Sequence, residues 1–305
     1  MNELETEGAK PKDCGCAECS GEAGSALIEQ FIYAIGRLEV RFPTIGIERE
    51  FQQRERTLES KGSLSASRTE RIRAVLADNP HLWSRVCFVL SIGHVPAYIV
   101  APSSQHTLHE LLNDASRGGD RNTFVTLIGR RAGAGKPGQC AGLLAPVAIC
   151  DQLYVFSVDE WIADLAARVE PVLKEREADP GHFATVAREF FDQVVSSTEN
   201  IGGLDTHRAL NYVLVQHPGL ALSVAQRPKS VLDRIETRPI QGTDLRKIVA
   251  VILTFVTRAT GVPERLFCRV DVTEEWPFLV EQQDSSVPSL GLLPYIENGL
   301  VGGAI

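Results

Sequence analysis

The sequence predicts an α+β fold, in which a mixed or antiparallel sheet with hairpins is flanked by helices in two closely packed subdomains. Two pairs of β-rich runs are separated by turn residues, one within 86–101 and the other within 247–273. Helical periodicity at 182–198 stands apart from these pairs instead of alternating with them, which favours α+β over a parallel α/β sheet. The chain also lacks an internal repeat of roughly 20–50 residues, which excludes solenoids and propellers.

Length and composition restrict the function classes. A chain of 305 residues with 44% apolar residues can bury a large core without disulfide staples. A formal charge of −8 argues against non-specific nucleic-acid binding, which requires Lys and Arg to neutralise phosphates. Met1–Lys10 is acidic and polar rather than a secretory signal, so we expect a reduced, cytoplasmic protein. The uncharged stretch Cys87–His109 contains Pro96 and Pro102, which favours buried strands over a membrane span.

Composition also predicts the domain order. We expect residues 1–26 to form a flexible, Cys-containing leader, 27–169 an N-terminal subdomain, 170–281 a C-terminal subdomain and 282–305 a flexible tail. The boundary near residue 170 follows from the charged and Pro-punctuated segment Glu170–Gly181.

Local patterns predict the individual elements. We expect one strand, or two strands joined at Gly36, in 31–42, followed by a helix over 47–59 with Thr44 as its N-cap. The other predicted helices are 68–76, 105–115, 158–168, 182–198, 206–216 and 220–226. The other predicted strands are 86–92, 97–101, 123–128, a run within 143–156, 247–257 and 266–273. Residues 130–139 are expected to form a basic, Gly-rich loop whose spacing does not fit a nucleotide-binding loop, so we expect no nucleotide cofactor.

Cysteines suggest one possible cofactor. Cys14, Cys16 and Cys19 have a spacing that can wrap one soft metal ion, which makes zinc a candidate. A closed zinc site needs a fourth ligand, so Cys140 and His207 are further candidate metal ligands. Cys140 follows the Gly-rich loop, where its thiol could be accessible. The alternative is a leader whose thiols are reduced and unliganded.

The densest polar run is Asp205–Tyr212. On a helix, His207 and Asn211 lie one turn apart on the same face. Because imidazole titrates near neutral pH, His207 is a candidate base, with Asp205 and Cys140 as the other candidate catalytic residues. Alternatively, His207 and Asn211 bond to the backbone and support the helix. The sequence lacks the spacing of a hydrolase elbow or a zinc protease, so an enzyme is not the favoured interpretation.

Five separated runs of the sequence carry a family resemblance. They are 31–43 with 46–51, 140–146, 151–156, 205–212 and 269–280. In this order they resemble the C-terminal domain of the cyanobactin maturation proteases of the PatG type. The residues that fall in the matching motifs are Tyr33, Gly36, Arg37, Glu48, Asp151, Tyr154, Arg208, Asn211, Asp271 and Glu274. Thr206 and Ala141 depart from the pattern, which argues mildly against a catalytic role at those two positions.

The resemblance implies an accessory protein in the maturation of ribosomally synthesised, post-translationally modified peptides. In that family the domain, a domain of unknown function, is appended to a subtilisin-like protease whose catalytic runs find no match here, so we expect a freestanding protein without protease activity. The implied partner is a precursor peptide or a biosynthetic enzyme, bound through a sheet edge or groove, with no nucleic acid and no membrane. Two alternatives stay open. One is a peptide-modifying enzyme that uses the Asp205, His207 and Cys140 region, and the other is a structural module that forms a homodimer.

Overall fold

The structure is a computed structural model that describes residues 30–62, 68–115, 122–136, 138–175, 179–227, 229–240, 245–280 and 292–295. Its helices are α1 (Ile45–Ser60), α2 (Arg68–Asp78), α3 (Gln105–Ala115), α4 (Val158–Glu175), α5 (Pro180–Val195), α6 (Asp205–Gln216) and α7 (Pro218–Ala225), with 3-10 turns η1 (Pro80–Arg85) and η2 (Cys140–Gly142). Its strands are β1 (Phe31–Arg41), β2 (Cys87–Ile92), β3 (Val95–Pro102), β4 (Thr123–Ala134), β5 (Pro146–Ser157), β6 (Ser230–Ile240), β7 (Ile248–Thr257), β8 (Pro263–Asp271), β9 (Phe278–Leu279) and β10 (Leu293–Pro294). These elements confirm the α+β fold.

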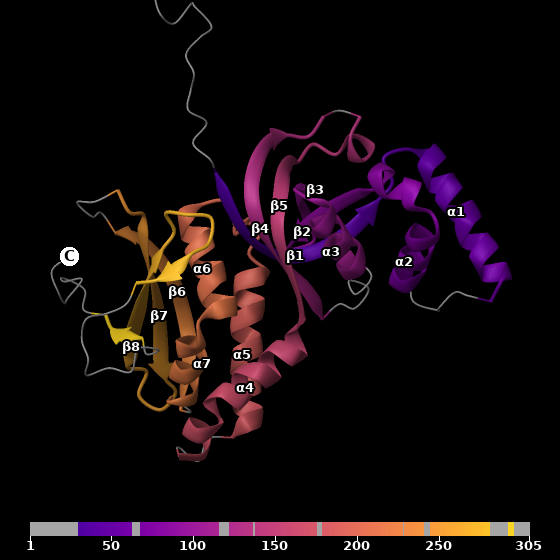
Figure 1. The fold of residues 1–305 in the computed structure, drawn as a ribbon. Coiled ribbons are helices and arrows are strands. Elements are labelled where there is room, and N and C mark those ends of the chain that lie inside the picture. The colour runs from indigo at the N-terminus through magenta and orange to yellow at the C-terminus, as the bar shows by residue number, and fades with distance from the viewer. Residues whose placement is uncertain are drawn as a thin grey trace, which may run out of the picture.

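The N-terminal strands form a barrel. In the described part of the chain, β1, β2, β3, β5 and β4 pair in that order and close on themselves (Figure 1). The β3–β5 pair is parallel and the other pairs are antiparallel. β1 is one continuous strand that pairs with β4 up to Gly36 and with β2 from Arg37 onward. A Cβ at position 36 would lie 2.6 Å from the carbonyl oxygen of Ser91, so a glycine is needed where β1 changes partner.

A second, antiparallel sheet has the order β10-β8-β7-β6, and β9 also pairs with β8. The β7–β8 hairpin confirms the predicted strand pair in 247–273. β10 pairs Leu293 with Phe267 and Pro294 with Leu266, so the prediction of a flexible tail is wrong for these residues. The leader 1–26 and the rest of the tail from residue 282 lie outside the described residues.

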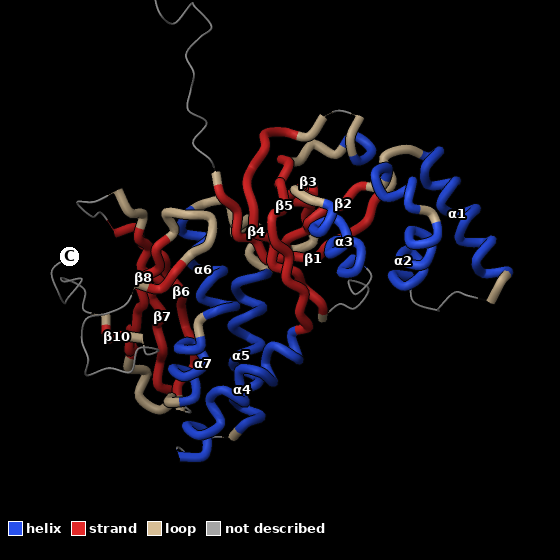
Figure 2. Tube along the Cα trace, in the orientation of Figure 1, coloured by secondary structure: helices blue, strands red, loops and turns tan. Residues whose placement is uncertain are grey.

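Helices α4, α5, α6 and α7 lie between the barrel and the second sheet (Figures 1 and 2). One apolar cluster joins all three layers and includes Ile35 of β1, Phe191 of α5 and Val251 of β7. The predicted boundary at residue 170 falls inside α4, and α4 contacts both α5 and α7. Within the described segments, none of the helices has the length and apolar character needed to cross a membrane.

A buried polar network attaches α6 to the barrel. The side-chain amide of Asn211 donates to the carbonyl oxygen of Tyr33 at 2.8 Å and accepts from the side chain of Asn200 at 2.7 Å. The backbone N–H of Tyr33 donates to the carbonyl oxygen of Gly202 at 2.9 Å. Gly202 has φ +74, and a Cβ there would lie 2.5 Å from the Tyr33 carbonyl oxygen. The α5–α6 loop is therefore fixed directly against β1.

Arg208 attaches the same helix to the second sheet. Its side chain is only 2% exposed, and its guanidinium donates to the carbonyl oxygens of Val272 at 2.7 Å, Glu275 at 3.1 Å and Glu274. Burial lowers the pKa of Arg208, whereas the carboxylate of Asp205, 3.4 Å away, opposes this shift. Three carbonyl acceptors and one carboxylate thus compensate a buried positive charge.

The prediction of a loop over residues 130–139 is wrong for residues 130–134, because β4 continues to Ala134. A bulge at Gly129 makes this extension possible, since a Cβ there would lie 1.9 Å from the carbonyl oxygen of Ile149. Arg130 pairs with Asp151 at 3.4 Å across the two strands. Arg130 and Arg131, which were expected in a loop, are thus part of the barrel wall, whereas Lys136 lies beyond the end of β4.

A disulfide joins Cys87 at the start of β2 to Cys140 in η2, with Cα atoms 5.5 Å apart. Cys140 is 2% exposed and packs in an apolar cluster with Ile99 and Ala145. The prediction that Cys140 has an accessible thiol is therefore wrong. Disulfides are typical of oxidising compartments, so the predicted cytoplasmic location stays a prediction that this bond does not support.

Replacing Asn211 with Ala is expected to lower the free energy of unfolding by about 2 kcal/mol, because the Tyr33 carbonyl and the Asn200 amide lose their buried partner. Denaturant unfolding checks this result. The matched control is Gln193→Ala, which removes an exposed amide from α5. A loss as small as that of the control would contradict the buried network.

Reduction of the disulfide is expected to lower the free energy of unfolding by about 4 kcal/mol, because the bond closes a long loop in the unfolded chain. The measurement compares denaturation of the protein with and without a strong reductant. A Cys87→Ser, Cys140→Ser double variant should be insensitive to the reductant. Equal stability of the wild-type protein under both conditions would show that the bond does not form.

Candidate functional site

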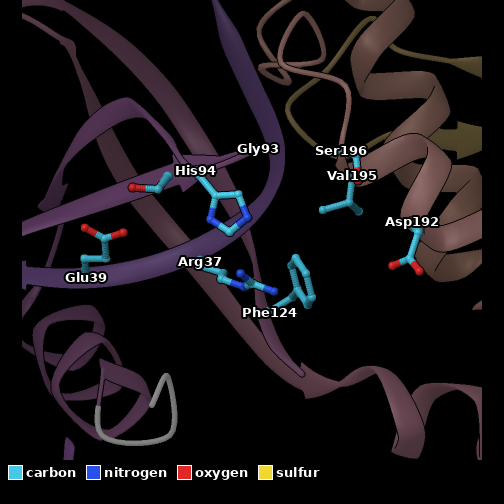
Figure 3. Close-up of a pocket in the computed structure, with 9 residues that line it drawn as sticks. Arg37, Glu39, Gly93, His94, Phe124, Asp192, Val195 and Ser196 are labelled. Atoms are coloured by element: carbon cyan, nitrogen blue, oxygen red, sulfur yellow. The ribbon is translucent and has the colours of Figure 1, made fainter. Parts of the chain in front are cut away.

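A cavity of about 190 Å³ opens where the outer face of β1 meets the C-terminal end of α5 and the β2–β3 turn (Figure 3). It is lined by Arg37, Glu39, Ser91, Gly93, His94, Phe124, Asp192, Val195 and Ser196. We call it the junction pocket. Its lining combines basic and acidic side chains with the apolar surfaces of Phe124 and Val195.

Strand alternation places two charged side chains in the junction pocket. Leu38 belongs to the apolar cluster of the barrel, so its neighbours Arg37 and Glu39 lie on the outer face of β1. The Arg37 guanidinium carbon lies 4.7 Å from the ring centre of Phe124, a distance at which the cation is attracted to the ring face. Glu39 pairs with Arg41 at 3.0 Å and is partly exposed.

The β2–β3 turn places His94 at the same pocket. Gly93 and His94 have φ values of +54 and +68, which fits the type I′ turn that suits tight hairpins. A Cβ on Gly93 would lie 2.8 Å from the side chain of Thr198, so this turn approaches the end of α5 closely. Figure 3 shows the exposed His94 ring near Arg37, with Glu39 on one side and Asp192 on the other.

The end of α5 contributes negative charge. Asp192 lies in the last turn, which contains no basic residue, and its carbonyl oxygen accepts from Ser196 at 2.9 Å. The C-terminus of a helix carries a partial negative charge from unpaired carbonyl groups, and Asp192 adds to it. Among the described residues, the Asp192 carboxylate has no ion-pair partner. The α5 wall of the pocket therefore attracts a cation.

A second cluster lies where β5 meets the loop after β8. Burial raises the pKa of Glu275, and a hydrogen bond with Asp151 raises it further, whereas Arg130 opposes the shift. The ring of Trp276 is 6.2 Å from that of Tyr154, whose side chain is 44% exposed. This arrangement brings two carboxyl groups, the exposed ring of Tyr154 and the partly buried ring of Trp276 together.

The structure does not assemble the predicted catalytic combination. Asp205 pairs with Arg208 at 3.4 Å and with Lys247 at 3.6 Å rather than with His207. Burial lowers the pKa of His207, which keeps its imidazole neutral at neutral pH. Cys140 is held in its disulfide in a cluster formed by barrel strands and η2. His207 and Asn211 do lie one turn apart on α6, but Asn211 uses its amide to hold β1.

The zinc prediction is untested. Cys14, Cys16 and Cys19 lie outside the described residues. Among the residues that the structure describes, no group of three His, Cys, Asp or Glu side chains is arranged to hold a metal ion. Cys140 is a disulfide sulfur here and not the thiolate that zinc prefers, so it is not the fourth ligand in this state.

The residues of the family motifs divide between sites and scaffold. Arg37 lines the junction pocket beside Gly36, and Asp151 and Tyr154 belong to the second cluster. The others support the fold or lie at its surface: Tyr33, Arg208 and Asn211 in the α6 contacts, Asp271 in an ion pair with Arg246, Glu48 on α1 and Glu274 in the loop after β8. Glu39, His94, Asp192 and Glu275 were not predicted as site residues, because their partners come from distant parts of the chain.

Replacing Glu275 with Gln is expected to stabilise the protein at pH 7. The folded state binds the Glu275 proton more tightly than the unfolded chain does, so stability is lost as the pH rises through the raised pKa. Gln removes this loss, and the gain stays below about 1 kcal/mol because the site is partly exposed to solvent. The gain should vanish below about pH 4, where the unfolded carboxyl is also protonated.

Denaturant unfolding of the wild-type protein and the variant, measured at pH 7 and below about pH 4, checks this expectation. The control is Glu274→Gln, which neutralises the exposed neighbour. A gain for Glu275→Gln that is equal at acid and neutral pH would contradict the assigned ionisation.

Comparisons with known proteins agree with this architecture. A family model described as PatG C-terminal matches residues 177–285. A solved structure, described as the PatG domain of unknown function, is similar to this chain with a TM-score of 0.64 and 18% sequence identity, over 83% of this chain and 97% of that chain. No curated protein matches the chain. Residues 177–285 are thus similar to the PatG C-terminal family, and the chain shares the fold of the PatG domain of unknown function.

Proposed function

We propose that this protein is an accessory protein in the maturation of ribosomally synthesised, post-translationally modified peptides, and that it binds the precursor peptide at the junction pocket. The family match supports an association with this type of biosynthesis. The observation that carries the binding role is the pocket itself, in which Arg37 and His94 lie between Glu39 and Asp192. Charges of both signs around an apolar surface suit the mixed polar and apolar character of a peptide.

The pocket favours binding over covalent catalysis. It contains Ser91, His94 and Asp192, which are residue types of a hydrolytic triad. However, the Ser91 hydroxyl is buried and has no hydrogen-bond partner, and within the described residues no hydrogen bond joins His94 to Asp192. A nucleophile is activated by a bond to its base, so this set lacks the first requirement for catalysis.

The size of the pocket limits how a peptide binds. A volume of about 190 Å³ is below the range of roughly 300–1,000 Å³ that is typical of drug-sized ligands. The pocket therefore accommodates one residue of a peptide, while the remainder of that peptide extends over the exposed rim formed by Glu39, His94 and Ser196.

The exposed edge of the second sheet is a less suitable peptide site. In the described residues, β6 pairs with β7 alone and leaves its other edge open. Its sequence contains Arg234, Glu236, Arg238 and Pro239, and a bulge follows Leu232. Charges, proline and bulges on an edge strand oppose the addition of another strand. The homodimer alternative, which could use this edge, stays a prediction.

Binding of a cyanobactin precursor peptide to the full chain tests the proposal. A fluorescently labelled peptide is titrated with protein, and mass spectrometry follows the peptide during the same incubation. We expect saturable binding without a change of mass. Arg37→Met keeps a side chain against Phe124 but removes the guanidinium, so it should weaken binding at least tenfold, or by about 1.4 kcal/mol.

The matched control is Arg49→Met, which removes an exposed guanidinium from α1. It should bind as the wild-type protein does. Absence of binding, or equal weakening by both variants, would contradict the proposal. A mass change that needs the protein would favour the peptide-modifying enzyme instead.

A further inference from the structure

We propose that the junction pocket recognises the free amino terminus of a peptide. The α-ammonium group would lie against the carboxylate of Asp192 and the carbonyl groups at the end of α5, and the first peptide carbonyl oxygen would accept from Arg37. This inference rests on the proposed function and adds which part of the peptide enters the pocket.

The cation side of this site is the end of α5. An ammonium group has three donors and needs several acceptors. The last turn of α5 supplies carbonyl oxygens that are not used within the helix, and it contains the Asp192 carboxylate but no basic residue. A negatively charged side chain at the negative end of a helix is unfavourable until a cation approaches. Asp192 and Ser196, both exposed, therefore form an acceptor set that a ligand can reach.

The anion side of this site is Arg37. Its position over the ring of Phe124 orients the guanidinium, and Figure 3 shows it in the same pocket as Asp192. A guanidinium has five N–H donors, so it can keep its existing protein contacts and still donate to a ligand. His94, on the same turn as Gly93, is exposed and lines the pocket together with Arg37.

A peptide amino terminus fits this combination better than other amines. In an amino-terminal residue, the ammonium group and the first carbonyl oxygen are attached to the same Cα, so both fit within one small pocket. A lysine side chain carries an ammonium group without a nearby acceptor for Arg37. A free amino acid has the same α-ammonium chemistry, but it would not use the exposed rim at Glu39 and His94. The size of about 190 Å³ suits a single residue with its chain continuing outward.

The test uses a short, C-terminally amidated peptide without charged side chains, with either a free or an acetylated amino terminus, and alanine amide as the probe for a lone residue. Binding to the full chain is measured by isothermal titration calorimetry at pH 7. We expect the free peptide to bind at least tenfold more tightly than the acetylated peptide, and more tightly than alanine amide. Asp192→Asn should remove the preference for the free peptide.

The control variant is Glu189→Gln, which removes an exposed carboxylate from α5 one turn earlier and outside the pocket. It should keep the tenfold preference. Both substitutions are on the helix surface, and circular dichroism verifies that both variants are folded. Equal affinity for the free and acetylated peptides, or a preference that survives Asp192→Asn, would overturn the inference.

Failure of the amino-terminal assignment can be distinguished from failure of the proposed function. If the precursor peptide binds in an Arg37-dependent manner but acetylation has no effect, the accessory role stands and the amino-terminal assignment is wrong. If the short peptide binds through its free amine and the precursor peptide does not bind, the pocket assignment stands and the role in precursor maturation is wrong.

Discussion

The buried guanidinium of Arg208 is the constraint on which the arrangement of the two sheets depends. It lies on α6, donates to three backbone carbonyl oxygens in the loop after β8, and is 5.3 Å from the ring centre of Phe31 in β1. A buried charge is costly unless it is hydrogen-bonded, so a shift of the loop after β8 away from α6 would remove the partners of a buried cation at a large energetic cost. Asn211, one turn later, adds a neutral bond to β1. Helix α6 is thereby held by both sheets at once.

This constraint extends to the junction pocket. The loop that enters α6 is fixed to β1 by the bond between Gly202 and Tyr33, and the same loop begins where α5 ends. The end of α5 is consequently held opposite the outer face of β1, where Arg37 and Glu39 lie. The walls of the pocket come from separate elements, but the buried polar contacts of α6 determine their spacing. Substitutions at the buried polar residues of α6 should therefore weaken peptide binding, although these residues do not line the pocket.

Much of the local structure followed from the sequence. The apolar spacing of α5, the Thr44 cap of α1 and the turns of both hairpins are short-range signals, and each is confirmed. The length of β4 was underestimated. The Gly and Arg residues after Ile128 indicated a loop, and only pairing with β5 stabilises a strand over residues 129–134. β6 was not predicted as a separate strand, because its charged residues lack the apolar alternation of a half-buried strand.

The sites were harder to predict than the elements. His94 and Asp192 are separated by about a hundred residues and meet only because α5 is held against the barrel, and the Asp151–Glu275 contact also joins distant segments. The Cys87–Cys140 bond is of the same kind, since Cys87 looks like an ordinary core residue and Cys140 follows a Gly-rich loop in a distant segment. Local patterns contain no information on such pairs. The family resemblance did indicate Arg37, Asp151 and Tyr154, although it could not indicate their partners.

Hydrogen exchange of the full chain with and without a precursor peptide tests the central claim most directly, because it locates the bound peptide without altering a residue. We expect slower exchange at three segments that line the pocket: β1 around Arg37 and Glu39, the turn at Gly93 and His94, and the end of α5. Protection confined to the β6 edge, or to the surface of Tyr154 and Trp276, would contradict it.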